Sequence, residues 1–371
     1  MTDRTKDIGK PREIDAWLGF NFPGRGEKYS GQKWHWDHFS GTDYDAGNDK
    51  TGIYRILGEN KYWSSSVGDE SGNADFLMFA DIDYSHPEVI KDVINWGLWV
   101  VKELKLKGFR FDACQHFSER FTNEFIAALE KEFGKLFLVG EFWTGNVKEM
   151  LEWLEGMHHK FSLYDSPLVY NFSQISTTKD ADLRKVFDGT LVQKQPQNAV
   201  TVVMNHDTQP GQTMQTKIEG FFKPLAYSLI LLRKEGYPTI FYGDLYGMKG
   251  ENPEPPACGG KLPDIALARK LYAYGDQEDY WNDPNCIGFV RRGTKEHPEG
   301  LACVMSNAEI NQVKMAVGDE HKGEIWTDVL GWEKREVKIG DDGYGTFPCG
   351  STSVSIWVKK DAPGRERFGK L

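Results

Sequence analysis

The sequence has few features of a secreted or membrane-spanning protein. Its five cysteines, in 371 residues, are odd in number and never in CxxC spacing. Neither a disulfide framework nor a cysteine zinc site is therefore indicated, and buried free thiols are expected. No apolar run approaches the roughly 18 residues of a transmembrane helix. The N-terminus, MTDRTKDIGKPREID, is charged and has no apolar segment of a secretory signal, so a cytoplasmic location is expected.

Positive charge is in deficit. Against 55 Asp and Glu there are 45 Lys and Arg, which gives a net charge of -10. Nucleic acid and anionic membranes attract basic surfaces, so neither is expected as a partner, and a neutral substrate fits better. Aromatic residues make up 13% of the chain and include 12 Trp. Flat rings can stack on sugars, although large cores also use Trp, so this composition leaves sugar binding open.

Five short apolar runs, separated by helix-bearing connections, predict parallel strands. They lie at residues 108–111, 136–141, 161–165, 199–204 and 239–244. Helices are predicted at 85–104, 121–133 and 224–235, the first from the capping-box spacing of Ser85 and Glu88. Strands and helices that alternate in this way favour an α/β fold of the βα-barrel type, although five strands are fewer than the eight of a closed barrel.

The texture of the chain divides it into three segments. Residues 1–75 are rich in Gly, Trp, Asp and Tyr with little periodicity, which predicts an irregular, loop-rich region. Residues 76–279 carry the predicted parallel strands. From about residue 280, short alternating runs (IGFV, LACVM, VKMAV, VSIWV) separated by Gly and Asp turns predict an antiparallel β domain over 280–371.

Three acidic residues follow predicted strands directly: Asp112 after GFRF, Glu141 after LFLVG, and Asp207 in VVMNHD. The carboxyl ends of barrel strands form the active-site face, so these acids are expected to converge. Because strand side chains alternate, Arg110 and Asp112 share one face of their strand. A guanidinium keeps a neighbouring carboxylate ionised, which suits either a nucleophile or a salt bridge.

Paired carboxyl groups of this kind fit glycoside cleavage. One carboxylate attacks the anomeric carbon while a second carboxylic acid protonates the leaving oxygen. Adjacent strands can place Asp112 and Glu141 at the separation that a retaining mechanism requires, and Asp207 can orient sugar hydroxyls. The competing interpretation is a buried ion-pair network at the end of the barrel.

Several motifs resemble the α-amylase family of glycoside hydrolases, in particular the liquefying bacterial enzymes and their intracellular fungal relatives. GFRFDACQH, GEFW and NHDTQPGQ are similar to the family's second, third and fourth conserved regions. FNFPGRG, KWHWDHFSGTDYD, LMFADIDYSHP and GYPTIFYGD resemble the sequence between those regions. The resemblance runs from about residue 14 to residue 358.

The resemblance implies roles for individual residues. Asp112 would be the nucleophile, Glu141 the general acid/base and Asp207 the transition-state stabiliser. The residues expected to bind an α-glucan substrate are Arg110, His116, Trp143, His206 and Gln115, where Gln115 replaces the lysine usual in the family. His116, Trp143 and His206 have the alternative of being packed core residues.

The family's first three barrel strands have no counterpart in this chain. The resemblance implies a partial (β/α)8 TIM barrel with strands four to eight, an irregular domain B remnant at the N-terminus and a C-terminal antiparallel β-sandwich. It also implies one structural Ca²⁺, with Asp75, Asp81 and the backbone carbonyl of His116 as ligands. Calcium usually takes six to eight oxygens, so the smaller set predicts weakened binding.

The expected activity is endo-hydrolysis of α-1,4-glucans with retention of configuration. A glucanotransferase that uses the same site is the alternative among enzymes. A truncated, non-catalytic glucan-binding protein, or an incomplete gene product, is the alternative outside catalysis.

Overall fold

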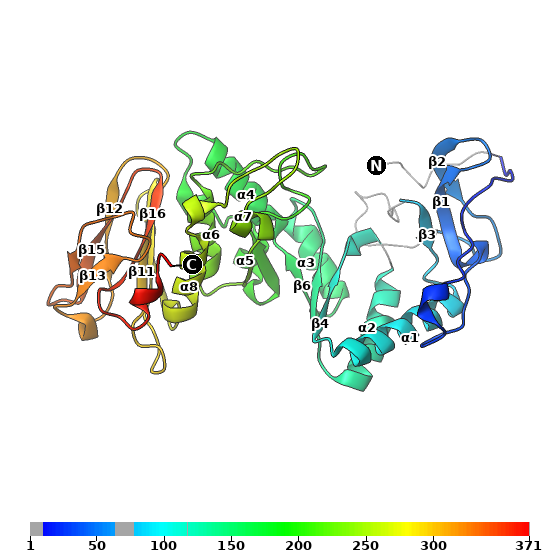
Figure 1. Ribbon diagram of the computed structural model, residues 1–371, viewed down its shortest axis with the longest axis horizontal. Coiled ribbons are helices and arrows are strands. Elements are labelled where there is room, and N and C mark those ends of the chain that lie inside the picture. The colour runs from blue at the N-terminus through cyan, green and yellow to red at the C-terminus, as the bar shows by residue number, and fades with distance from the viewer. Residues whose placement is uncertain (1–9, 64–77, 117, 371) are drawn as a thin grey trace. The chain divides into compact units, whose positions relative to one another are not determined.

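The computed structural model describes residues 10–63, 78–116 and 118–370 (Figure 1). The chain forms two compact units. The first contains residues 1–144 and 148–164, and the second contains residues 145–147 and 165–371. The sequence-based segments 1–75, 76–279 and 280–371 stay a prediction, and the two units divide the chain inside the middle one.

The first unit begins with a small antiparallel sheet in the order β2-β1-β3. Its strands are β1 (Phe39–Asp45), β2 (Lys50–Arg55) and β3 (Ala80–Ile82), preceded by the single turns η1 (Pro23–Arg25) and η2 (Trp36–His38). Trp34 and Phe39 are buried here with Val89 of helix α1 (Pro87–Leu104). The predicted loop-rich region therefore has a core of its own, packed on the start of α1.

Three parallel strands follow in the same unit: β4 (Gly108–Phe111), β5 (Phe137–Gly140) and β6 (Phe161–Tyr164). The helices α2 (Glu119–Phe133) and α3 (Val147–Gly156) separate them. Gly97 of α1 lets α2 approach closely, since a Cβ at this position would lie 2.5 Å from the Phe125 ring. These three strands match the predicted ones within one or two residues.

Helix α1 starts differently from the capping-box prediction. Its N-cap is His86, whose side chain accepts a hydrogen bond from the Glu88 N–H. Ser85 is engaged elsewhere, because its N–H and hydroxyl both donate to Asp83 Oδ1. The structure thus replaces the predicted serine cap by a histidine.

The second unit contains the parallel pair β7 (Ala199–Val202) and β8 (Tyr237–Thr239) with α4 (Ser166–Thr177), α5 (Leu191–Lys194), α6 (Lys223–Leu232), α7 (Tyr242–Tyr246) and α8 (Leu262–Tyr272). Single turns of 3-10 helix are η5 (Leu183–Lys185), η6 (Pro196–Asn198) and η7 (Cys258–Gly260). The prediction of a strand over 239–244 was wrong, because the strand ends at Thr239 and the chain turns into α7. This turn brings buried Asp244 to Lys223 Nζ at 2.7 Å and to the Tyr227 hydroxyl at 2.6 Å.

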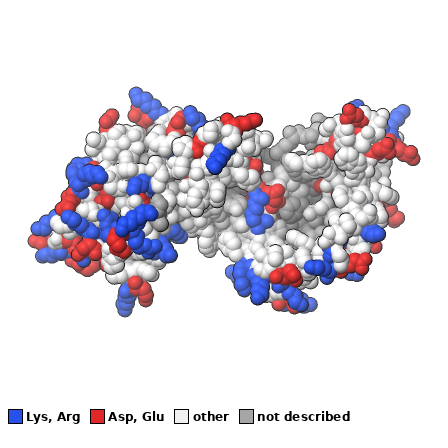
Figure 2. Space-filling view, viewed as in Figure 1, with Lys and Arg blue, Asp and Glu red and all other residues white. Residues whose placement is uncertain are grey.

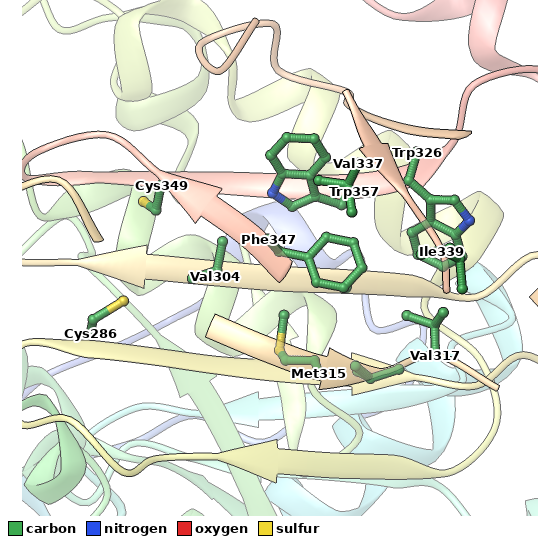
Figure 3. Close-up of a cluster of buried hydrophobic side chains, with 12 residues drawn as sticks. Cys286, Val304, Met315, Val317, Trp326, Val337, Ile339, Phe347, Cys349 and Trp357 are labelled. Carbon is green, nitrogen blue, oxygen red and sulfur yellow. The ribbon is translucent and has the colours of Figure 1, made fainter. Parts of the chain in front are cut away.

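The C-terminal strands confirm the predicted antiparallel β architecture. A six-stranded sheet has the order β14-β13-β16-β11-β10-β9, and β12 pairs with β15. The bounds are β9 (Gln277–Tyr280), β10 (Cys286–Arg291), β11 (Leu301–Ser306), β12 (Asn311–Ala316), β13 (Ile325–Asp328), β14 (Val337–Lys338), β15 (Tyr344–Cys349) and β16 (Ser353–Lys359), with turns η8 (Asp319–His321) and η9 (Arg365–Arg367). Figure 3 shows the core between the two sheets, in which Trp326, Phe347 and Trp357 are almost fully buried.

These elements confirm the predicted fold class, a partial parallel barrel followed by an antiparallel β region. Among the described residues, β4 pairs on one side only, with β5, and β8 pairs on one side only, with β7. No helix in the described ranges is long and apolar enough to cross a membrane. On the face shown in Figure 2, basic and acidic side chains are interspersed.

Candidate active site

The site in the first unit is built where β4 and β5 end. The two strands pair in parallel, with Phe111 opposite Gly140. The backbone bonding continues past the strands, since Glu141 N–H donates to the Phe111 carbonyl at 2.8 Å and Cys114 N–H to the Glu141 carbonyl at 3.0 Å. Asp112 and Glu141 therefore leave the sheet side by side, as their positions after the strands predict.

The alternation in GFRFD has the expected consequence. Phe109 and Phe111 both pack against the Phe125 ring, at 6.1 and 6.2 Å between centroids. Arg110 and Asp112 lie on the other face and form an ion pair through Arg110 Nη1 and Asp112 Oδ1. The separation of the two phenylalanines from Arg110 and Asp112 thus follows from strand geometry alone.

Arg110 also binds Glu141, which the sequence did not predict. Its Nη2 donates to Glu141 Oε2 at 2.7 Å. The Ala113 N–H donates more weakly to the same oxygen, at 3.4 Å. One guanidinium therefore holds both carboxylates, and it fixes the orientation of the nucleophile candidate and of the acid candidate together.

The two carboxyl groups differ sharply in burial. The Glu141 side chain is 9% exposed, whereas that of Asp112 is 75% exposed. Burial raises the pKa of Glu141 above its usual range, and the hydrogen bond with Asp112 raises it further. Arg110 and the Ala113 N–H oppose this rise without cancelling it. Glu141 is thus the member of the pair that holds a proton more readily.

Burial of Arg110 lowers its pKa, but the charges of Glu141 and Asp112 outweigh this effect and the pKa is raised. Arg110 therefore stays a cation throughout, which is what an anchoring residue for two acids requires.

The turn after β4 carries further candidate residues. Ala113 has φ +44°, in the left-handed region, and it leads into the single turn η4 (Cys114–His116). Gln115 is half-buried, and its Oε1 is buried with no hydrogen-bond partner among the described residues. His116 and Trp143 are also half-buried. Their roles toward a substrate stay predictions.

Gly140 is required by the close approach of this turn. A Cβ at Gly140 would lie 2.8 Å from Cys114 Sγ and 2.8 Å from Leu163 Cδ2. Cys114 is buried, and its thiol donates to the Glu141 carbonyl at 3.3 Å. The fully buried thiol is a packing group, and burial raises its pKa well above the usual value.

The NHD motif forms a tight turn in the second unit, just after β7. Asn205 Oδ1 accepts hydrogen bonds from the N–H groups of Asp207 and Thr208 at 2.9 and 2.8 Å, and Thr208 Oγ1 accepts from the Asn205 N–H at 2.9 Å. The turn presents His206 and Asp207 to solvent, with 64% and 37% of their side chains exposed, and His206 Nε2 lies 3.1 Å from Asp207 Oδ2. These exposures contradict the alternative that His206 is a packed core residue. The convergence of Asp207 with Asp112 and Glu141 stays a prediction.

Of the predicted calcium ligands, Asp75 lies outside the described residues. Asp81 is on β3, where it accepts a hydrogen bond from the Ser40 hydroxyl. In the part of the chain that the structure describes, Asp81 belongs to no group of three close His, Cys, Asp or Glu ligand atoms. Asp81 and a His116 carbonyl are hard oxygen donors of the type calcium accepts, so the residues present fit the ion in chemistry but not in number.

Sequence reasoning missed a cluster of His38, His86 and Glu88. Ligand atoms of these three residues all lie within 4.8 Å of one another. The HPE run (His86 to Glu88) places two possible ligands two residues apart, but nothing in the sequence connects it to His38, which lies 48 positions upstream of His86. Only the packing of η2 against the start of α1 joins them.

Comparison with known proteins places the chain in a family. The family model "Alpha amylase, catalytic domain" matches residues 27–269. The α-amylase of Bacillus licheniformis is 41% identical over 362 residues, which cover 96% of this chain and 70% of that protein. The cytoplasmic α-amylase of Escherichia coli K12 is 37% identical over 368 residues, which cover 96% of this chain and 74% of that protein.

Solved structures support the fold. The α-amylase of Geobacillus thermoleovorans in complex with acarbose has a TM-score of 0.60 at 18% identity, covering 82% of this chain and 76% of that one. An Anoxybacillus α-amylase has a TM-score of 0.61 at 18% identity, covering 81% and 70%. With the carboxylate site and the family model in agreement, this chain belongs to the α-amylase family and is a glycoside hydrolase of the α-amylase type.

Proposed function

We propose that this chain is an endo-acting α-1,4-glucan hydrolase that works by double displacement with retention. The observation that carries the proposal is the pair of carboxyl groups of Asp112 and Glu141, which one guanidinium, that of Arg110, binds together, with Glu141 buried and Asp112 exposed. Inverting enzymes keep their carboxyl groups about 6.5–9.5 Å apart to admit a water molecule, whereas retaining enzymes keep them at about 5–5.5 Å. Two carboxyl groups that follow paired neighbouring strands and bind the same guanidinium favour the shorter separation, and therefore retention.

In the first step, Asp112 attacks the anomeric carbon while Glu141 donates its proton to the glycosidic oxygen. The carbon–oxygen bond breaks, the leaving sugar departs as an alcohol, and a glycosyl ester forms on Asp112. In the second step, ionised Glu141 takes a proton from water, whose oxygen attacks the same carbon and releases Asp112. Each residue returns to its starting protonation state.

Arg110 supports both steps through its contacts with Asp112 and Glu141. It keeps Asp112 ionised for attack and stays bonded to Glu141 as that residue alternates between acid and base. Asp207 and His206 are assigned to the transition state and to sugar hydroxyls, in keeping with their exposed positions on the NHD turn. His116, Trp143 and Gln115 are assigned to the leaving-group side.

The same site could pass the glycosyl group to a second sugar in place of water. The feature that motivates this alternative is Gln115, which stands where the family usually has a lysine and would alter the contacts to the product-side sugar. A glucanotransferase would convert a short maltooligosaccharide into longer products as well as shorter ones, and a hydrolase would give shorter products only.

The predicted set of Asp75, Asp81 and the His116 carbonyl offers the oxygen donors that a calcium ion takes, but fewer than the usual six to eight. Calcium bound there would supply a fixed positive charge that links oxygens from separate segments. Of these groups, Asp81 is held in place by the Ser40 hydroxyl.

We also propose a cytoplasmic location. The five cysteines are all free and buried, which suits a reducing compartment. A relative with 37% identity is named as cytoplasmic. Fractionation of the source cells followed by immunoblotting would test this, and recovery outside the cytoplasm would contradict it.

The test of activity is cleavage of an end-blocked maltoheptaoside by the purified chain. Release of internal fragments, with the first product in the α-anomeric form by proton NMR, is expected. Asp112→Asn should abolish this activity, and Glu152→Gln, on an exposed site of α3, should leave it unchanged. Binding of the glucan with no turnover by the unaltered chain would support a non-catalytic glucan-binding protein instead, and a first product in the β form would refute retention.

A further inference from the structure

A second cluster of chemically active side chains lies in the first unit, apart from the carboxylate pair. It joins η2 to the start of α1 and consists of His38, His86 and Glu88, with ligand atoms within 4.8 Å of one another. We propose that these residues form a binding site for a divalent transition-metal ion of the Zn²⁺ class. Next to them, Phe39, which follows η2, and Val89 of α1 belong to one buried apolar cluster.

The spacing is close to that of a metal site. His38 Nε2 lies 3.0 Å from Glu88 Oε2, and the rings of His38 and His86 are 4.6 Å apart between centroids. Ligands at about 2.0–2.2 Å from a tetrahedral zinc are separated from one another by about 3.4 Å. Shifts of about 1 Å would therefore bring the three ligand atoms to bonding distance. The Glu88 side chain is 56% exposed, and its Oε2 accepts from Gln32 Nε2 at 2.9 Å, a surface hydrogen bond that the movement would have to break.

A bound metal would change the hydrogen bonds of His38. In the present arrangement its Nδ1 accepts from the His35 N–H at 2.9 Å, and its Nε2–H donates to Glu88. A metal would bind Nε2 of the other neutral tautomer, so the single ring proton moves from Nε2 to Nδ1 and no proton is released from the ring. Nδ1 then no longer accepts from the His35 N–H, and its own N–H lies 3.3 Å from the His35 carbonyl and 3.3 Å from Asp37 Oδ1. Metal-bound histidines commonly donate their second N–H to such a carbonyl or carboxylate.

Metal binding at His86 would break one hydrogen bond of the helix cap. Its Nδ1 caps α1 by accepting from the Glu88 N–H at 3.2 Å. This bond is lost on metal binding through either nitrogen, because the metal takes the lone pair of Nδ1 or leaves a proton on it. A 3.2 Å hydrogen bond is long, so a metal–nitrogen bond outweighs it.

Two imidazoles and one carboxylate select the class of ion. Imidazole suits zinc, copper and nickel, whereas calcium takes six to eight oxygen ligands. The cluster therefore differs in chemistry from the oxygen set proposed around Asp81. Entry is open on the Glu88 side, while His38 is 2% exposed and forms the floor. An ion here would tie η2 to the first turn of α1 and would stabilise the first unit.

The experiment uses the full, tag-free chain, treated with a chelator and then resupplied with Ca²⁺. Titration with Co²⁺ is followed by visible absorption, and Zn²⁺ affinity is obtained from displacement of Co²⁺. We expect one equivalent of Co²⁺ with the intense bands of four- or five-coordinate geometry, and a melting temperature that rises with Zn²⁺.

Three variants decide the assignment. Glu88→Gln keeps the exposed side chain but loses the anionic ligand, and His86→Asn keeps an acceptor for the helix cap but removes the imidazole. Each should weaken Zn²⁺ binding by about tenfold or more, since even residues that only support a metal ligand contribute about 10–100-fold. His158→Gln removes an exposed histidine of the same unit and should change nothing. Equal affinity in all variants, absorption typical of Co²⁺ in water alone, or displacement of Co²⁺ by millimolar Ca²⁺ would each overturn the proposal.

Discussion

Replacement of Glu141 by Gln tests whether Glu141 is the general acid/base and Asp112 the nucleophile. The change keeps the size of the side chain and leaves an oxygen to accept from Arg110 Nη2, whose present contact with Glu141 is 2.7 Å. It removes the transferable proton and, in the ionised form, the carboxylate that acts as a base. General acid and base catalysis contributes about 10²–10⁴-fold, or about 3–5 kcal/mol of barrier, so kcat/KM on an unactivated maltooligosaccharide should fall by that factor.

The loss should depend on the leaving group. An aryl α-maltooligosaccharide with an acidic phenol needs no proton to depart, so Asp112 can still attack and the first step should be nearly as fast as in the unaltered chain. The glycosyl ester then accumulates, since no base activates water. Added azide, a nucleophile that needs no deprotonation, should restore turnover and give an α-glycosyl azide.

The assay is a comparison of kcat/KM and of the burst phase on both substrates, for the unaltered chain, for Glu141→Gln and for Glu152→Gln as a surface control. Melting temperatures would verify that the fold is kept. An equal loss on both substrates, with no burst and no effect of azide, would refute the assignment of Glu141 as the proton donor. A loss below about tenfold on the maltooligosaccharide would refute it as well.

Four further predictions follow from particular contacts and pKa shifts. Glu141 must be protonated to act as an acid and its pKa is raised, so kcat/KM should fall as pH rises through that pKa, and this basic limb should be absent for Glu141→Gln on the aryl substrate. Gly140→Ala should lower the free energy of unfolding by about 1–3 kcal/mol through overpacking, measured by urea titration, whereas Gly19→Ala, with no atoms within 4 Å of its Cβ, should have little effect. Burial raises the pKa of Asp165 to about 6 from 3.8, so this residue makes the free energy of unfolding depend on pH. Its contribution to that free energy, on the order of 3 kcal/mol, is full below pH 3.8 and is lost as pH rises through about 6. Asp165→Asn should remove this pH dependence from urea titrations performed across that range. A calcium chelator should lower the melting temperature, and an unchanged value would argue against a bound calcium ion.

Local patterns in the sequence predicted much of the first unit's site. The alternation in GFRFD predicted that Arg110 and Asp112 share one face of the strand and that Phe109 and Phe111 share the other, because strand geometry repeats every two residues. The structure adds that these two rings pack on Phe125. The placement of Glu141 after an apolar run predicted that it would leave the sheet beside Asp112. Both inferences needed only neighbours within a strand and the parallel order of adjacent strands.

Other features depend on partners distant in the sequence. The FYGD segment reads as a continuing strand, yet it turns into α7 because Asp244 is buried against Lys223 and Tyr227 of α6. Ser85 reads as a helix cap, yet Asp83 captures its hydroxyl and His86 takes its place. In each case a tertiary hydrogen bond outweighs a local preference.

The sequence by itself determined the family, the succession of strands and the identity of the candidate acids, since these depend on motifs and on periodicity that neighbouring residues carry. Only the tertiary structure decided that one guanidinium holds both Asp112 and Glu141, that Glu141 is the buried member of the pair, and that His38 meets His86 and Glu88. The physical reason is that burial, and the pKa shift that it causes, depend on which surfaces the folded chain brings together, and these surfaces come from segments tens of residues apart.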